Sequence, residues 1–216
     1  MQFSRPPSAA EPARSRPLYG PEGPIHSSQP VGALGIPFPK IPFSSEYYRF
    51  HNTGLSGIVD HAYQALAIDE HRRVFAPTLW TRKPEHTVVE QRWFIGAHAN
   101  VGGGYARDPL PAIAMRWIQQ KAAACGLAMD KEVEVRGDAH RAPVRDSFKE
   151  FMYGAYVLFR GGRRHYRTIG TTLNETVDDS VLQRRAQDPS YRPPGLEKYL
   201  ARSGPPIVPS GPPSGP

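Results

Sequence analysis

The segment 93–105 constrains the fold of this chain most strongly. It begins with three large apolar residues, Trp93, Phe94 and Ile95, which are typical of a buried strand. The chain then enters a glycine-rich loop, GAHANVGGGY, that carries His98. Glycines allow tight turns and close approach of other groups. A strand that runs directly into such a loop predicts that a functional site lies at this edge of a sheet.

The residues after this loop predict a helix over 109–127. Apolar side chains recur there at helical spacing. Asp108 is the expected N-cap, with Pro109 at the first helical position and Gly126 as the C-cap. Strand, loop and helix in this order indicate an α/β fold.

Two further segments have apolar patterns. Residues 54–73 place their apolar side chains at helical spacing, which predicts a second helix. Residues 31–39, VGALGIPFP, are typical of a strand end that runs into a loop, and residues 151–159 are apolar and aromatic.

Composition divides the chain of 216 residues into three parts. It contains 24 prolines and 20 glycines, and the prolines are concentrated at the two ends. We expect residues 1–30 and 201–216 to be disordered and residues 31–200 to form the folded domain. The one cysteine, Cys125, excludes a disulfide framework, and no apolar run reaches the length of a membrane helix. The N-terminus has no Sec-type signal, so we expect a cytoplasmic protein or one exported without a cleaved signal.

His98 is the principal candidate for chemistry. It follows a buried strand, and open α/β sheets place their sites beyond the carboxyl ends of strands. The alternative is a loop histidine that only packs against Trp93. No metal-ligand spacing such as H-E-x-x-H accompanies any histidine, so we expect no metal and no cofactor.

Several motifs in order resemble one known family. They are VGALGIP (31–37), FHNTGLS (50–56), HAYQALAIDEHRRVFAPTLW (61–80), EQRWFIGAHANVGGGY (90–105) and LPAIAMRWIQQKAAACGL (110–127). Together they resemble the α/β-hydrolase domain family that includes phospholipase (Tle-type) effectors of bacterial type VI secretion. Pieces between 165 and 196 also look like the C-terminal part of that family. The resemblance implies the C-terminal part of an α/β-hydrolase fold.

The resemblance also implies a Ser–Asp–His triad that hydrolyses lipid esters. His98 stands at the position of the family's general base. Gln29 stands at the family's aspartate position, and glutamine cannot balance an imidazolium charge. No G-x-S-x-G nucleophile elbow occurs in the sequence, and Ser56 is interpreted as a structural residue near a helix start. The adjacent Asp69 and Glu70 are expected to pair with Arg72, Arg73 or loop groups and not to act in catalysis.

These departures predict a fragment of a serine hydrolase that is inactive as written, or active only when a partner polypeptide supplies the serine. We hypothesise that residues 1–30 are out-of-frame or non-native sequence, and we expect the strand at 92–95 to lack its neighbours. The implied partners are a lipid or phospholipid substrate and a secretion-machinery or immunity partner. The alternative function is a non-catalytic interaction or immunity-like module on a degenerate hydrolase fold.

A net charge of +7 gives little support for nucleic-acid binding, and none is expected. The basic run RGGRRHYR (160–167) is interpreted as a solvated turn. Its alternative is a patch formed by Arg160, Arg163 and Arg164 that docks on anionic lipid.

Overall fold

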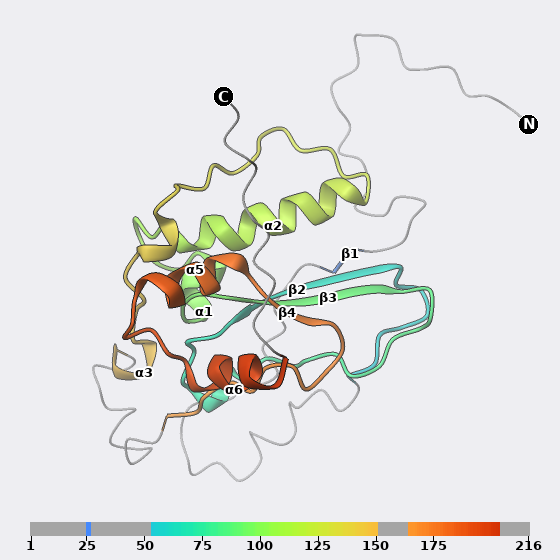
Figure 1. Ribbon diagram of the computed structural model, residues 1–216. Helices are drawn as coiled ribbons and strands as arrows, with labels where there is room; N and C mark the ends of the chain where they lie inside the picture. The colour runs from blue at the N-terminus through green and yellow to red at the C-terminus, as the bar shows by residue number, and fades with distance from the viewer. Residues whose placement is uncertain (1–24, 27–52, 151–163, 204–216) are drawn as a thin grey trace, which may run out of the picture.

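A computed structural model describes residues 25–26, 53–150 and 164–203 of the chain (Figure 1). The described strands are all short, and five α-helices accompany them in the described ranges. In chain order the elements are β1 (Ile25–His26), β2 (His61–Ala67), β3 (Val88–Phe94), α1 (His98–Gly102), α2 (Leu110–Ala124), α3 (Ser147–Glu150), β4 (Glu175–Val177), α5 (Asp179–Gln187) and α6 (Pro194–Ser203). Short 3-10 turns lie at Arg73–Phe75 and Ala139–Arg141.

The strands form a parallel sheet in the order β1-β2-β3-β4. The β2–β3 pair is the longest, with His61 opposite Val88 and Ala67 opposite Phe94. Parallel strands with covering helices confirm the predicted α/β class. The expectation that the strand at 92–95 lacks neighbours is wrong, because β3 lies between β2 and β4.

The helix predicted over 54–73 is also wrong. Its centre is β2, and Ser56 lies near a turn in which its carbonyl accepts the Val59 amide. The error has a physical cause. A strand of a parallel sheet is buried on both faces, so the sequence of β2 is largely apolar and lacks a strict alternation of apolar and polar residues. Some of its apolar residues are therefore also three or four positions apart, as in a helix.

The strand and helix around the glycine-rich loop are confirmed. β3 contains Trp93 and Phe94, and α2 spans most of the predicted 109–127. The Asp108 carboxylate accepts the Leu110 amide at 3.0 Å and so caps the start of the helix, but the N-cap residue is Pro109 and not Asp108, one residue later than predicted. Gly126 adopts a φ of +85°, as a residue that ends a helix in the left-handed region does.

Two apolar clusters hold the layers together. Neighbouring residues of each strand point to opposite faces, so Leu66 and Trp93 join one cluster while Ala67 and Phe94 join the other. The first cluster includes Val181 of α5 and Leu196 of α6, and the second includes side chains of α1 and α2. Figure 1 shows α2 and α6 on opposite sides of the sheet.

Some predictions lie outside the described residues. They concern Gln29, the strand end at 31–39, the segment 151–159, and Arg160 with Arg163 in the basic run. The proposed boundaries at 30 and 200 are likewise predictions. No described helix is long and apolar enough to cross a membrane.

Candidate functional site

The candidate site lies where β2 and β3 end. Because the two strands are parallel, their carboxyl ends meet at one edge of the sheet. The ladder continues one step further on each strand, as the Ile68 amide donates to the Phe94 carbonyl and the Asp69 amide donates to the Gly96 carbonyl. The segment after β2 therefore lies beside the loop that carries His98.

Glycine and asparagine fix the shape of that loop. Gly96 has a φ of +105°, and a Cβ placed there would lie 2.4 Å from the Cβ of Asn100. The Asn100 side chain accepts the Ala97 amide at 3.0 Å and donates to Asp108 at 2.7 Å. Asn100 is fully buried, so it ties the start of α1 to the start of α2. His98, the first residue of α1, stands on this rigid frame.

His98 is bonded to Glu70. Its Nδ1 lies 2.6 Å from Oε2 of Glu70, and the His98 side chain is 31% exposed. A carboxylate oxygen at this distance accepts a hydrogen bond, so in the neutral imidazole we place the hydrogen on Nδ1. The Nε2 atom, which then carries the lone pair, has no partner in the described part of the chain.

The Glu70 carboxylate is buried and fully bonded. Arg72 donates from its backbone amide, Nε and Nη2 at 2.9 to 3.0 Å, and the Ser147 hydroxyl donates to both carboxylate oxygens. Burial by itself raises the pKa of Glu70, but the hydrogen bonds from His98 and Arg72 and the Arg72 charge outweigh it. The pKa of Glu70 is held well below its ordinary value, so the group stays ionised.

Phe75 orients the imidazole ring from its other side. The two rings are stacked at 4.5 Å with an interplanar angle of 15°. The Arg72 guanidinium lies 4.0 Å from the centre of the Phe75 ring and 3.1 Å from Nδ1 of His98. Glu70 and Phe75 thus fix the orientation of His98, and Arg72 contacts both of them.

The neighbouring Asp69 has different partners. Its Oδ2 accepts the Gly96 amide at 2.8 Å and the Tyr191 hydroxyl at 2.9 Å. Burial raises the pKa of Asp69 to about 6, against the lowering effect of both hydrogen bonds. Asp69 joins the histidine loop to the segment between α5 and α6, and it does not touch His98.

Sequence reasoning found His98 but missed Glu70 as its partner. The expected pairing of Glu70 with Arg72 is confirmed, and the carboxylate also holds His98. One signal was present in the sequence, because Glu70 follows β2 much as His98 follows β3. The helix predicted over 54–73 concealed it.

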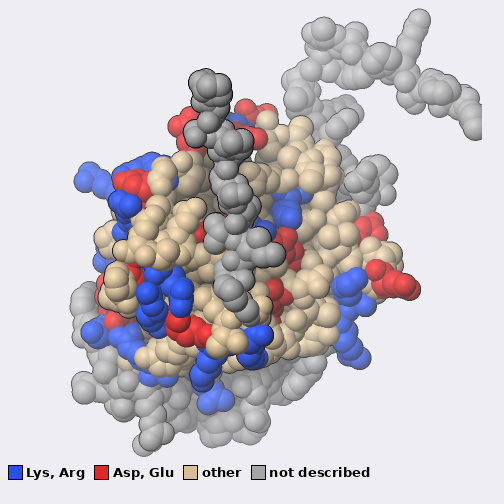
Figure 2. All heavy atoms as spheres, viewed as in Figure 1, with Lys and Arg blue, Asp and Glu red and all other residues tan. Residues whose placement is uncertain are grey.

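The remaining polar candidates have separate locations. His61 lies in β2, His71 stacks edge-on against Tyr166, and His86 contacts Asp60. Within the described ranges no group of three or more His, Cys, Asp or Glu residues could hold a metal. Cys125 packs against the cluster beneath α2. On the face drawn in Figure 2, Lys and Arg side chains are interspersed with Asp and Glu.

An apolar groove of about 690 Å³ runs along α1 and α2. Its lining carries no charged side chain and includes Val101, Gly102, Pro111, Met115 and Ile118.

Comparison with known proteins gives one match. Residues 29–121 match the family model described as the catalytic domain of Tle1-like phospholipase effectors of type VI secretion. The matched part is less than half of the chain, begins next to Val31 and contains both Glu70 and His98. No curated protein and no solved structure matches the chain. The resemblance seen between 165 and 196 stays a prediction.

Proposed function

Residues 29–121 belong to the catalytic-domain family of Tle1-like phospholipase effectors of type VI secretion, and on this premise we propose that the chain provides the general base of a lipid ester hydrolase. The observation that carries the proposal is the His98–Glu70 pair. One ring nitrogen is bonded to a buried carboxylate, and the other is half-exposed and without a described partner. A general base of the Ser–His–carboxylate type needs this arrangement.

In the proposed reaction, Nε2 of His98 takes the proton of a nucleophilic hydroxyl as its oxygen attacks the ester carbonyl. The imidazolium returns that proton to the departing alcohol, which leaves an acyl-enzyme. Water, deprotonated by the same nitrogen, then releases the fatty acid. Glu70 stabilises the imidazolium and keeps hydrogen on Nδ1 throughout.

Glu70 supports a revised view of the carboxylate in this chain. The family position for aspartate is occupied by Gln29, which suggested that the histidine lacks a charged partner. We propose that Glu70 fulfils this role, because its carboxylate already touches Nδ1. The nucleophile is then the one missing member. Ser147 does not replace it, since its buried hydroxyl is bonded to Glu70 and not to Nε2.

The fold supports the same proposal. Parallel strands with both faces covered, and a site at their carboxyl edge, fit the C-terminal part of an α/β-hydrolase fold. The uncharged groove along α1 and α2 is compatible with an apolar substrate. We propose a phospholipid as that substrate and secretion by the type VI machinery as the context.

The test requires the serine. The chain is produced together with the polypeptide encoded directly upstream, which we expect to contain a G-x-S-x-G segment. Fatty-acid release from phospholipid micelles is then compared between the native sequence and His98→Ala. We expect a loss of about 10³-fold or more, as for other triad histidines. An unchanged rate in His98→Ala contradicts the proposal, and so does an upstream region that encodes no such segment in any frame.

A second measurement needs no turnover. Long-range ¹H–¹⁵N spectra report which imidazole nitrogen carries the proton. We expect His98 to show hydrogen on Nδ1 in the native chain and a mixture of tautomers in Glu70→Ala. The same mixture in both chains would remove Glu70 from the proposed mechanism.

A further inference from the structure

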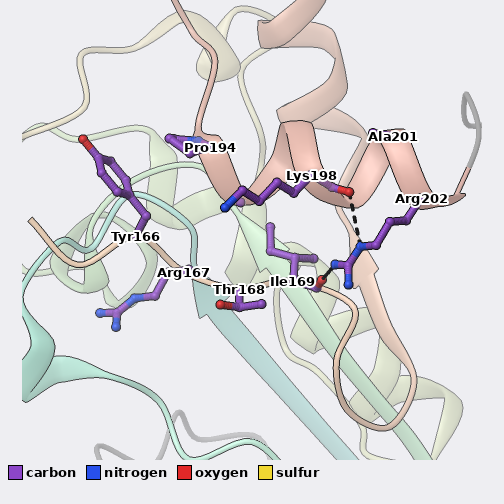
Figure 3. Close-up of a pocket in the computed structure, with 9 residues that line it drawn as sticks. Tyr166, Arg167, Thr168, Ile169, Pro194, Lys198, Ala201 and Arg202 are labelled. Atoms are coloured by element: carbon purple, nitrogen blue, oxygen red, sulfur yellow. Dashed lines mark hydrogen bonds between the residues drawn. The ribbon is translucent and has the colours of Figure 1, made fainter.

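A second cavity lies on the side of the sheet opposite α2. It has a volume of about 490 Å³, within the range of small-ligand sites. One wall is the segment 166–169 and the other is a face of α6 (Figure 3). It is lined by Tyr166, Arg167, Thr168, Ile169, Pro194, Gly195, Lys198, Ala201 and Arg202.

The charged residues of this cavity are all positive. Arg167, Lys198 and Arg202 line it, and no Asp or Glu does. The acid nearest in sequence, Glu197, is bonded to Arg185 through both oxygens, at 2.7 and 2.8 Å. The Lys198 amine has no partner among the described residues, and Figure 3 shows its side chain extended along the cavity toward Pro194. The lining of the cavity therefore contains basic side chains and no acidic one.

Arg167 adds a buried charge to the wall. It is 5% exposed and uses only Nη2, which donates to the carbonyls of Arg72 and Phe75 at 3.2 and 2.8 Å. Its Nε and Nη1 are buried without a hydrogen-bond partner. No carboxylate forms an ion pair with it within the described ranges. A buried charge is weakly screened, so Arg167 contributes a positive field at the cavity, which the nearby Glu70 charge partly offsets.

The rest of the lining is apolar or aromatic. Ile169, Pro194 and Ala201 form apolar parts of the walls, and the Tyr166 ring is 47% exposed at the margin. Cations beside apolar walls and an exposed aromatic ring match a molecule with an anionic head and an apolar body.

We propose that this cavity binds the phosphate of a phospholipid, with Lys198 and the field of Arg167 holding the anion and Tyr166 lying against the lipid body. The inference rests on the proposed function only for the identity of the ligand as a lipid. Cavity and candidate site share the segment 71–75, because the His165 amide bonds to His71 and Arg167 bonds to Arg72 and Phe75. A lipid surface held here lies next to the segment whose Arg72 and Phe75 contact the base, His98.

The experiment measures binding without hydrolysis. The full chain is sedimented with vesicles of phosphatidylcholine alone and of phosphatidylcholine with phosphatidylglycerol. The variants are Lys198→Glu and Tyr166→Ala. The control is Lys131→Glu, the same charge change at an exposed residue whose carbonyl accepts from Gln119 of α2, on the other side of the sheet. Thermal melting checks that each variant is folded.

We expect Lys198→Glu to weaken binding to the anionic vesicles about tenfold or more, and Lys131→Glu to bind as the native chain does. Equal loss in both lysine variants would overturn the site, because general charge would explain it. Absence of binding to either vesicle would also overturn it. Saturation by inorganic phosphate, with no preference for vesicles, would overturn the assignment to lipid. None of these outcomes depends on His98, so failure here leaves the hydrolase proposal intact.

Discussion

Two adjacent carboxylates at the end of β2 face different halves of the molecule. Glu70 bonds His98 of α1, Ser147 of α3 and Arg72 in the segment after β2. Asp69 faces the segment before α6, where it bonds Tyr191, and its other partner is the Gly96 backbone. Both are buried, yet their pKa values move in opposite directions.

The difference lies in the partners. Burial raises the pKa of both groups, but Glu70 has a guanidinium in direct contact, whereas Asp69 has only neutral donors. A carboxylate that must stabilise an imidazolium has to remain charged, and Glu70 meets this requirement. A carboxylate that only connects two segments through hydrogen bonds, as Asp69 does, need not remain charged. The opposite pKa shifts therefore fit the chemical role that we propose for Glu70 and a structural role for Asp69.

Removal of the Glu70 charge should have the largest effect. Glu70→Ala removes the carboxylate that pairs with the buried Arg72 side chain, which costs about 3–5 kcal/mol of stability. Denaturant unfolding measures the loss. Glu90→Ala is the control, because Glu90 pairs with Arg92 and Lys121 at a more exposed location and should cost about 1 kcal/mol. Comparable losses in the two variants would mean that the Glu70–Arg72 pair is not a special feature of the fold.

The double variant Glu70→Gln with Arg72→Met sharpens the same point. It removes both charges, so most of the lost stability should return while the His98 tautomer stays mixed. The double variant would then show that the free energy of unfolding and the tautomer of His98 depend on Glu70 in different ways.

Substitution of Gly96 should affect both carboxylates at once. The Gly96 amide bonds to Asp69, and the added Cβ of Gly96→Ala meets Asn100 at 2.4 Å with φ at +105°. We expect a loss of about 2–4 kcal/mol, from the clash and the strained backbone. Gly102→Ala is the matched control, since nothing lies within 4 Å of its added Cβ. Thermal melting of the two variants gives the comparison, and equal melting temperatures would refute the close packing at Gly96.

The pH dependence of stability should identify Asp69. Its pKa is raised from 3.8 to about 6, so the native state binds the proton more tightly than the unfolded state. The contribution of Asp69 is therefore fully present below about pH 4 and is lost as the pH rises to about 6, by about 3 kcal/mol. Asp69→Asn should remove this slope, because asparagine does not titrate. The amide oxygen can still accept from Gly96 and Tyr191, so the variant should fold. Unfolding measured from pH 4 to pH 8 tests this, and an unchanged slope would assign it to another group.

Much of this site was predictable from sequence, because local signals determine it. His98, the glycines around it and the helix that follows are contiguous, so one pattern indicated strand, loop and helix. The capping role of Asp108 also followed from position alone. In these places the strongest interactions join residues close in sequence.

The Glu70–His98 contact was not predictable in the same way. It joins residues 28 apart, and it depends on β2 being a strand parallel to β3. A strand buried on both faces has no alternation, so its pattern did not exclude a helix. The role of Asp69 was even harder to predict from the sequence, because its partner Tyr191 lies 122 residues away. Which of two adjacent carboxylates meets the histidine is decided by strand pairing and not by local pattern.

We expect the smallest effect from Tyr191→Phe. This variant changes a partner of Asp69 and leaves every partner of Glu70 in place. The variant keeps the ring but removes the hydroxyl that donates to Asp69, a loss of about 1 kcal/mol. Because this hydrogen bond lowers the pKa of Asp69, its removal should raise that pKa further and move the pH-dependent loss of stability to higher pH. The His98 tautomer should not change, since Glu70 keeps all its partners. Unfolding across the pH range and the imidazole spectrum of the same variant measure both effects. A changed tautomer would show that Asp69 and Glu70 act as one unit.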